Sequence, residues 1–141
     1  MRDNRSRVLL VEDQESTRDG LAEALALAGY LVDRFDAGGR ALEYLGSGPT
    51  PDVILLDLYL RSDMDGWQFA EKVKASPRAA EIPIVAMTGA RLDTQDWERA
   101  RFDAFFFKPL ELRSLLRTIE RLVELRGGRV LGDRTAKSFI A

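Results

Sequence analysis

The chain has 141 residues, of which 45% are hydrophobic and 31% charged, and its 21 Lys and Arg nearly balance its 23 Asp and Glu. This length and apolar content suit one domain with its own core, and the balanced charge argues against nucleic-acid binding through a bulk basic surface. The absence of cysteine and histidine excludes disulfides, the usual zinc sites, thiol nucleophiles and Ser-His-Asp triads. Any chemistry must therefore depend on carboxylates, hydroxyls, lysine or arginine.

No segment of the sequence has the composition of a membrane span or a secretion signal. Its apolar runs are far shorter than the roughly 20 residues needed to cross a bilayer. Residues 1–7 are mostly charged or polar and lead directly into a strand-like run, unlike a signal peptide. We therefore expect a cytoplasmic protein.

Short apolar runs alternate with longer amphipathic stretches along the chain. In chain order they predict a strand at 8–11, a helix at 16–28, a strand at 30–35, a helix at 39–45, a strand at 53–56, a helix at 67–75, a strand at 84–87, a helix at 94–100, a strand at 104–107 and a helix at 112–123. Gly29 suits the position just past the end of the first helix, and charged residues place the strand at 30–35 on a sheet edge. This alternation predicts an α/β fold, with a parallel sheet covered on both faces.

We expect this fold to occupy residues 7–126, after an N-terminal extension at 1–6. The segment 127–141 shows no periodicity and is expected to be a loosely ordered tail. It is too short to form an output domain of its own.

Reactive side chains stand directly after four of the predicted strands. They are two carboxylates after the first strand, one after the third, a hydroxyl after the fourth and an ammonium after the fifth: Glu12, Asp13, Asp57, Thr88 and Lys108. In open parallel sheets, ligands bind at the carboxyl ends of the strands. Carboxylates are suitable ligands for Mg²⁺, a hydroxyl and an ammonium can donate to phosphoryl oxygens, and Asp57 is placed to form an aspartyl phosphate.

Taken singly, these residues have plain structural interpretations. Asp13 is equally suited to cap the first helix, Thr88 to end a strand, and Lys108 to be a solvated charge before a helix. Their shared position at strand ends favours a joint site, and an ordinary loop carboxylate is a poor explanation for Asp57.

Five short motifs occur in a specific order and spacing: VLLVED at 8–13, VILLD at 53–57, MDG at 64–66, MTG at 87–89 and FFFKP at 105–109. With these motifs the chain resembles the receiver domain of two-component response regulators, in the form of a stand-alone, CheY-like receiver. The resemblance implies a flavodoxin-like three-layer sandwich, with a five-stranded parallel sheet of order 2-1-3-4-5 and five helices. In that order the first and third strands are neighbours, which would bring Glu12 and Asp13 next to Asp57.

The resemblance also implies a role for each residue of the site. Asp57 would accept a phosphoryl group from the phosphohistidine of a sensor histidine kinase or a histidine phosphotransfer protein. Mg²⁺ would be held by Asp13, Asp57 and the backbone carbonyl of Tyr59, with Glu12 acting through a metal-bound water. Lys108 would pair with Asp57 and then with the phosphate.

The implied function is a phosphorylation-activated signalling switch rather than an enzyme, since the domain would assist only its own phosphorylation and dephosphorylation. Thr88 would hydrogen-bond a phosphate oxygen and move toward it, which would allow Phe105 to turn inward. This movement would alter a protein-interaction surface near the fourth and fifth helices. The implied partners are the phosphodonor and a downstream protein target, with no direct contact to nucleic acid or membrane.

Three features depart from the family pattern. The family usually has a proline four residues after the phosphoacceptor, and here Arg61 stands at that position. The loop before the MDG motif is also one residue longer than usual. Phe105 replaces a frequent tyrosine, so the switch position has no hydroxyl. Tyr59 and Ala90 occupy positions that, in the family, influence attack of water on the phosphoaspartate and hence the phosphate lifetime.

The main alternative is an atypical receiver that binds partners without being phosphorylated. It predicts loss of acidic residues, threonine or lysine from the site, and here all are present. A phosphatase of the haloacid dehalogenase type usually has a second aspartate shortly after its nucleophile, where this chain has Tyr59. A flavin-binding electron carrier shares the fold, but no Ser/Thr/Gly-rich phosphate loop follows the first strand.

Overall fold

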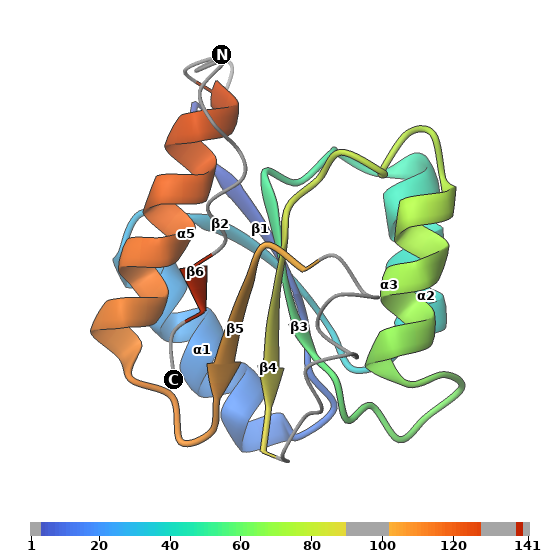
Figure 1. The fold of residues 1–141 in the computed structure, drawn as a ribbon, viewed down its shortest axis with the longest axis horizontal. Coiled ribbons are helices and arrows are strands. Elements are labelled where there is room, and N and C mark those ends of the chain that lie inside the picture. Colours follow the sequence, from blue (N-terminus) through green and yellow to red (C-terminus); the bar gives the residue numbers. More distant parts are fainter. Residues whose placement is uncertain (1–3, 90–101, 128–137, 140–141) are drawn as a thin grey trace.

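The computed structural model describes residues 4–89, 102–127 and 138–139 of the chain (Figure 1). The elements in these ranges are β1 (Arg7–Val11), α1 (Glu15–Leu27), β2 (Leu31–Phe35), α2 (Gly38–Ser47), β3 (Val53–Asp57), α3 (Gly66–Ala75), β4 (Ile84–Thr88), β5 (Ala104–Phe107), α5 (Leu112–Gly127) and β6 (Ser138–Phe139). None of the helices among them has the length and apolar character to cross a membrane. The helix expected at 94–100 lies outside the described residues.

The strands form one parallel sheet in the order β2-β1-β3-β4-β5-β6. The predicted order 2-1-3-4-5 and the edge position of the second strand are therefore confirmed. The short strand β6 was not predicted, because it lies in the segment for which the sequence shows no periodicity. It pairs with β5 through the register of Ala104 with Ser138 and Phe105 with Phe139.

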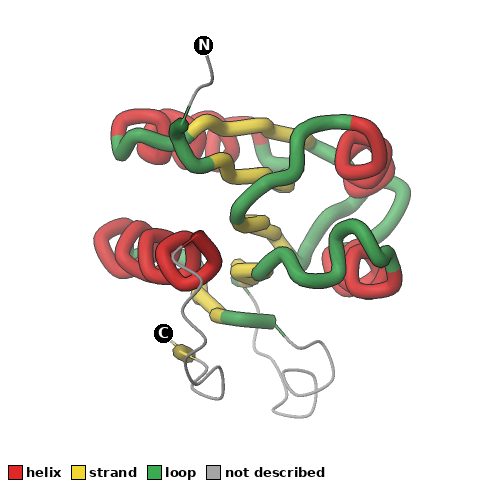
Figure 2. Tube along the Cα trace, turned by 90° about the horizontal axis from the view of Figure 1, so that it is seen from above, coloured by secondary structure: helices red, strands yellow, loops and turns green. Residues whose placement is uncertain are grey.

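Helices cover both faces of the sheet, with α1 and α5 on one face and α2 and α3 on the other (Figures 1 and 2). Successive residues of a strand point to opposite faces. In β1, Leu9 and Val11 join the core that contains α2 and α3 residues, whereas Val8 and Leu10 join the core that contains α1 and α5 residues. Every residue of β3 and β4 is buried, which explains why the sequence of each is a nearly continuous apolar run.

The helix ends follow local sequence signals. Gly29 has a φ of 102°, the left-handed conformation expected just past the end of α1. α3 begins with a capping box, in which the Asp65 side chain accepts from the Gln68 N–H at 2.8 Å. The Gln68 side chain accepts in return from the Asp65 N–H at 3.0 Å. These contacts set where the loop after β3 ends.

The loop between β3 and α3 is held by one contact within itself and by one contact to α2. The Gly66 N–H donates to the Leu58 carbonyl oxygen at 3.0 Å, which closes the loop on itself. The Asp63 carboxylate accepts from the Gly39 N–H at 3.0 Å and so satisfies the start of α2, where Ala37 provides no side-chain cap. The longer loop noted in the sequence is therefore fixed by contacts to its own base and to α2.

We expect Gly66→Ala to lower the free energy of unfolding by about 1–3 kcal/mol. Its Cβ would lie 2.5 Å from both the Asp57 carbonyl oxygen and the Leu58 Cα, and backbone atoms cannot rotate away. Gly20→Ala in α1 is the matched control, because nothing lies within 4 Å of its added Cβ and alanine favours a helix. Urea unfolding measures the stability of both variants. A Gly66→Ala variant as stable as the wild type would contradict the close approach at Gly66.

Candidate functional site

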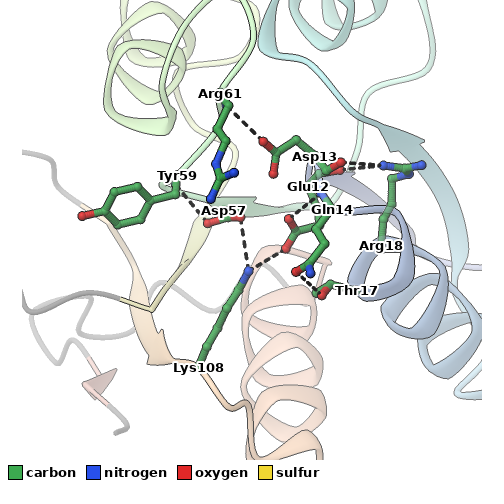
Figure 3. Close-up of polar contacts among 9 residues, drawn as sticks. All are labelled: Glu12, Asp13, Gln14, Thr17, Arg18, Asp57, Tyr59, Arg61 and Lys108. Carbon is green, nitrogen blue, oxygen red and sulfur yellow. Dashed lines mark hydrogen bonds and ion pairs between the residues drawn. The ribbon is translucent and has the colours of Figure 1, made fainter.

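The carboxyl ends of β1, β3 and β5 meet at one edge of the sheet, where Lys108 joins two buried carboxylates (Figure 3). Its Nζ donates to Glu12 Oε1 at 2.8 Å and to Asp57 Oδ2 at 3.2 Å. Glu12 is fully buried and Asp57 is 3% exposed, so this ion contact lies at the base of the site. The structure thus brings together three residues that the sequence placed at separate strand ends.

The three acidic side chains form a compact group of possible metal ligands. One carboxylate oxygen from each of Glu12, Asp13 and Asp57 lies within 4.8 Å of the others. Asp13 does not cap α1, since Gln14 is the N-cap residue of that helix. Instead, Asp13 Oδ2 accepts from the backbone N–H of Arg61 at 3.1 Å. The helix-capping interpretation of Asp13 is therefore not the one that the structure shows.

Backbone donors orient the two buried carboxylates. The Tyr59 N–H donates to Asp57 Oδ1 at 2.9 Å, and the Gln14 N–H donates to Glu12 Oε2 at 3.1 Å. Each carboxylate therefore receives one backbone donor and one donor from Lys108. Such paired contacts reduce the cost of burying a charge and hold the oxygens in fixed positions.

Arg18 is a supporting residue that the sequence did not predict. Its guanidinium donates from α1 to the backbone carbonyls of Glu12 and Asp13, at 3.1 and 3.4 Å. It thereby holds the turn that carries both acidic side chains. The sequence did offer a signal for this contact. Arg18 is a basic residue near the start of the helix that directly follows the acidic end of β1.

Burial and neighbouring charges shift the pKa values of Glu12 and Lys108 at the base of the site. Burial raises the pKa of Glu12 from 4.5 to about 7, and the neighbouring Asp57 carboxylate adds to this rise against the opposing effect of Lys108. Burial by itself would lower the pKa of Lys108. The hydrogen bond to Glu12 and the charge of Asp57 outweigh burial, so the pKa of Lys108 is raised and its ammonium stays protonated.

The expected switch residues lie on the neighbouring strands. Thr88 ends β4 and is fully buried, and its backbone carbonyl accepts from the Lys108 N–H at 2.8 Å. Phe105 in β5 is 1% exposed and packs edge-on against Phe102, with ring centroids 5.1 Å apart. The ring of Phe105 lies in the core in this structure, and its expected movement on activation stays a prediction. Ala90 lies outside the described residues.

An open cleft of about 410 Å³ lies over this group of residues. It is lined by Glu12, Asp13, Gln14, Asp57, Tyr59, Arg61, Gly89 and Lys108. The Tyr59 side chain projects away from Asp57 and the residue is 55% exposed, whereas the Arg61 side chain points into the cleft toward Asp57 (Figure 3). Arg61 was noted in the sequence only as a departure from the usual proline, and its position in the cleft was not predicted.

Comparison with known proteins agrees with this arrangement. The family profile of the response regulator receiver domain matches residues 8–120. The chain belongs to this family. Its members are regulatory domains of two-component systems, so this receiver domain is a signalling module of that class.

Individual relatives cover most of the receiver domain. Two-component response regulator ORR5 of Oryza sativa subsp. japonica is 34% identical over 119 residues, which are 82% of this chain and 87% of that protein. Response regulator receiver protein CpdR of Brucella abortus is 32% identical over 117 residues, covering 83% and 96% respectively.

Solved structures show the same fold. Chemotaxis protein CheY4 of Vibrio cholerae is 27% identical with a TM-score of 0.76, over 84% of this chain and 98% of that one. A CheY-like receiver domain protein of Methanospirillum hungatei shares the fold at 23% identity and a TM-score of 0.80, over 89% of this chain and 99% of that one. The flavodoxin-like fold expected from the sequence is therefore confirmed.

The burial of Glu12 predicts an unusual titration in metal-free receiver domain. With its pKa raised to about 7, the folded state retains a proton that the unfolded chain releases near 4.5. The stabilisation from this proton is complete below the unfolded pKa and is lost as the pH rises through the folded pKa. Carboxyl ¹³C NMR in EDTA should therefore show a Glu12 midpoint near 7.

Urea unfolding provides a second measurement of the same effect. Between pH 4.5 and about 7, the free energy of unfolding of the wild type should fall as the pH rises. Glu12→Gln should show a smaller fall, because glutamine does not titrate. Glu23→Gln removes the same charge from an exposed position of α1 and controls for net charge. A Glu12 midpoint near 4.5 would contradict the expected effect of burial.

Proposed function

We propose that this receiver domain is a phosphorylation-activated switch in which Asp57 accepts the phosphoryl group and Mg²⁺ assists. One observation supports this above all: Lys108 contacts both Asp57 and Glu12 at the base of an open cleft. A carboxylate nucleophile, an acidic metal-ligand group and a fixed cation are the parts that transfer to an aspartate requires. The proposed domain spans residues 7–126, and its proposed phosphodonors imply a cytoplasmic location.

The donor set of the cleft fits Mg²⁺. Asp13, Asp57 and the backbone carbonyl of Tyr59 would hold the ion, with Glu12 acting through a bound water. Three carboxylates within 4.8 Å of one another are hard oxygen donors, which this cation prefers. When bound, Mg²⁺ supplies positive charge that offsets the negative charge of the phosphoryl oxygens.

The proposed transfer begins from the phosphohistidine of a sensor histidine kinase or a phosphotransfer protein. A carboxylate oxygen of Asp57 attacks phosphorus, the P–N bond breaks, and its electron pair returns to the imidazole of the donor. The Tyr59 N–H keeps the carboxylate in a fixed orientation, at 2.9 Å from Oδ1. Lys108 is already within 3.2 Å of Oδ2 and is placed to follow the phosphoryl oxygens.

Phosphorylation would reach the protein-binding surface through β4 and β5. The new acceptor oxygens at Asp57 would draw the Thr88 hydroxyl, and the backbone contact between Lys108 and Thr88 couples the two strand ends. Phe105 would respond from its buried position against Phe102. We propose that a downstream protein target reads this change near α5, where a shallow cleft of about 570 Å³ is lined by Leu112, Arg113, Leu116, Arg117 and Glu120.

The alternative is an atypical receiver that binds partners without phosphorylation. The departure at Arg61 is the feature that favours it, because a large side chain from the loop after Asp57 enters the cleft. The retained Asp57, Thr88 and Lys108 favour the phosphorylated switch.

We expect Asp57→Asn to abolish phosphoryl uptake while leaving the fold intact, because the amide has nearly the same shape and is not a nucleophile. Intact-mass spectrometry after incubation with acetyl phosphate and Mg²⁺ should show one added phosphoryl group on the wild type and none on the variant. Wild type in EDTA should show none. Asp19→Asn is the matched control, since Asp19 is an exposed carboxylate of α1 that pairs with Arg34.

Two outcomes would count against the proposal in different ways. Phosphorylation of Asp57→Asn at the wild-type level would show that the acceptor is another residue. If the wild type takes up no phosphoryl group although calorimetry shows that it binds Mg²⁺, the atypical receiver becomes the better explanation.

A further inference from the structure

We propose that Arg61 is a second phosphoryl-binding cation of this site, acting beside Lys108. The inference rests on the proposed function, since it assumes that a phosphoryl group reaches Asp57. It assigns to the loop after β3 a part in anion binding, in addition to its part in placing a metal ligand.

The backbone of the loop holds Arg61 in a defined position at the rim of the cleft. Its N–H donates to Asp13 Oδ2 at 3.1 Å, which ties the residue to the carboxyl end of β1. The next part of the loop is tied to α2, since the Asp63 carboxylate accepts from the Gly39 N–H at 3.0 Å. Because the backbone is fixed on both sides, only the side-chain torsions of Arg61 need to be ordered when it meets a ligand.

The Arg61 side chain is directed toward Asp57 and has donors to spare. Figure 3 shows it extending from the loop toward Asp57, and both residues line the same cleft. Its guanidinium makes no hydrogen bond or ion pair with any residue in the described part of the chain. Lys108, in contrast, already donates to Glu12 and to Asp57. Arg61 is thus placed to offer its donors to an anion that enters the cleft.

The guanidinium group suits a phosphoryl group in both shape and charge. A guanidinium group carries a positive charge and presents parallel N–H donors that match two oxygens of a phosphoryl group. Among the described residues, three carboxylates lie at this edge, and Lys108 forms ion pairs with two of them. Converting the Asp57 carboxylate to an acyl phosphate adds further negative charge. A second cation offsets that charge without being a metal ligand.

Arg61 has no part in bond making. As an Asp57 oxygen attacks phosphorus and the bond to the leaving group breaks, Arg61 donates hydrogen bonds to the phosphoryl oxygens and keeps its protons. Its contribution is therefore affinity for the anion in the cleft.

Calorimetric binding of two probes tests this inference without turnover. The first probe is Mg²⁺ alone, and the second is beryllofluoride, a phosphoryl analogue, added in saturating Mg²⁺. We expect Arg61→Gln to weaken beryllofluoride binding by about tenfold, because it loses a charged hydrogen-bond donor. Its affinity for Mg²⁺ should stay the same or rise, because a positive charge near the metal ligands has been removed while the backbone N–H to Asp13 is retained.

Two further variants complete the comparison. Arg61→Lys keeps the charge and should recover part of the beryllofluoride affinity. Arg121→Gln removes the same charge from an exposed position of α5 outside both clefts and should bind both probes as the wild type does. Because Arg61 is exposed, these substitutions should leave the thermal unfolding temperature nearly unchanged.

The outcomes separate this inference from the function on which it rests. If Arg61→Gln binds beryllofluoride as tightly as the wild type, Arg61 is not a phosphoryl-binding residue and the proposed switch is unaffected. If the variant loses affinity for both probes, its effect is a general one on the loop, and the inference is also wrong. If the wild type binds beryllofluoride no better than Asp57→Asn does, the proposed function fails and this inference fails with it.

Discussion

The ammonium of Lys108 lies between two buried carboxylates, those of Glu12 and Asp57, and the whole site depends on this ion contact. Two negative charges brought out of water so close together would each cost several kcal/mol without a cation and hydrogen-bond donors. The partners are 96 and 51 residues from Lys108 along the chain, so the contact exists only when β1, β3 and β5 end at the same edge. The contact is therefore a product of the tertiary fold.

The sheet converts an apolar sequence pattern into a precise polar site. β3 and β4 are buried along their full length, and their backbone ladders fix the point at which each strand leaves the core. Asp57 pairs in register with Met87, and the Leu58 N–H continues the ladder to the Met87 carbonyl at 2.9 Å. The Asp57 carboxylate consequently stands on a rigid strand end, where its orientation does not depend on a flexible loop.

The loop after β3 is where the sequence of this receiver domain departs most from the family pattern. A proline at the place of Arg61 would offer neither a backbone donor to Asp13 nor a side-chain charge. Arg61 offers both, with the N–H at 3.1 Å from Asp13 Oδ2 and the guanidinium in the cleft. The longer loop is accommodated because Asp63 satisfies the start of α2. Sequence change at this loop thus alters the electrostatics above Asp57 without disturbing the strand that carries it.

The sequence by itself determined the strands β1 to β5, their parallel arrangement and the reactive residues at their ends, because these follow from local apolar patterns and from chain order. The left-handed conformation of Gly29 and the approximate bounds of α1 could also be predicted from the sequence, since each depends on a few neighbouring residues. Only the tertiary structure decided that Gln14 rather than Asp13 occupies the N-cap position of α1, and that Arg61 points into the cleft. Those outcomes depend on which distant groups meet in space. A side chain at a strand end or in a loop chooses its partners only after the sheet has brought β1, β3 and β5 together, and spacing along the chain does not encode that choice.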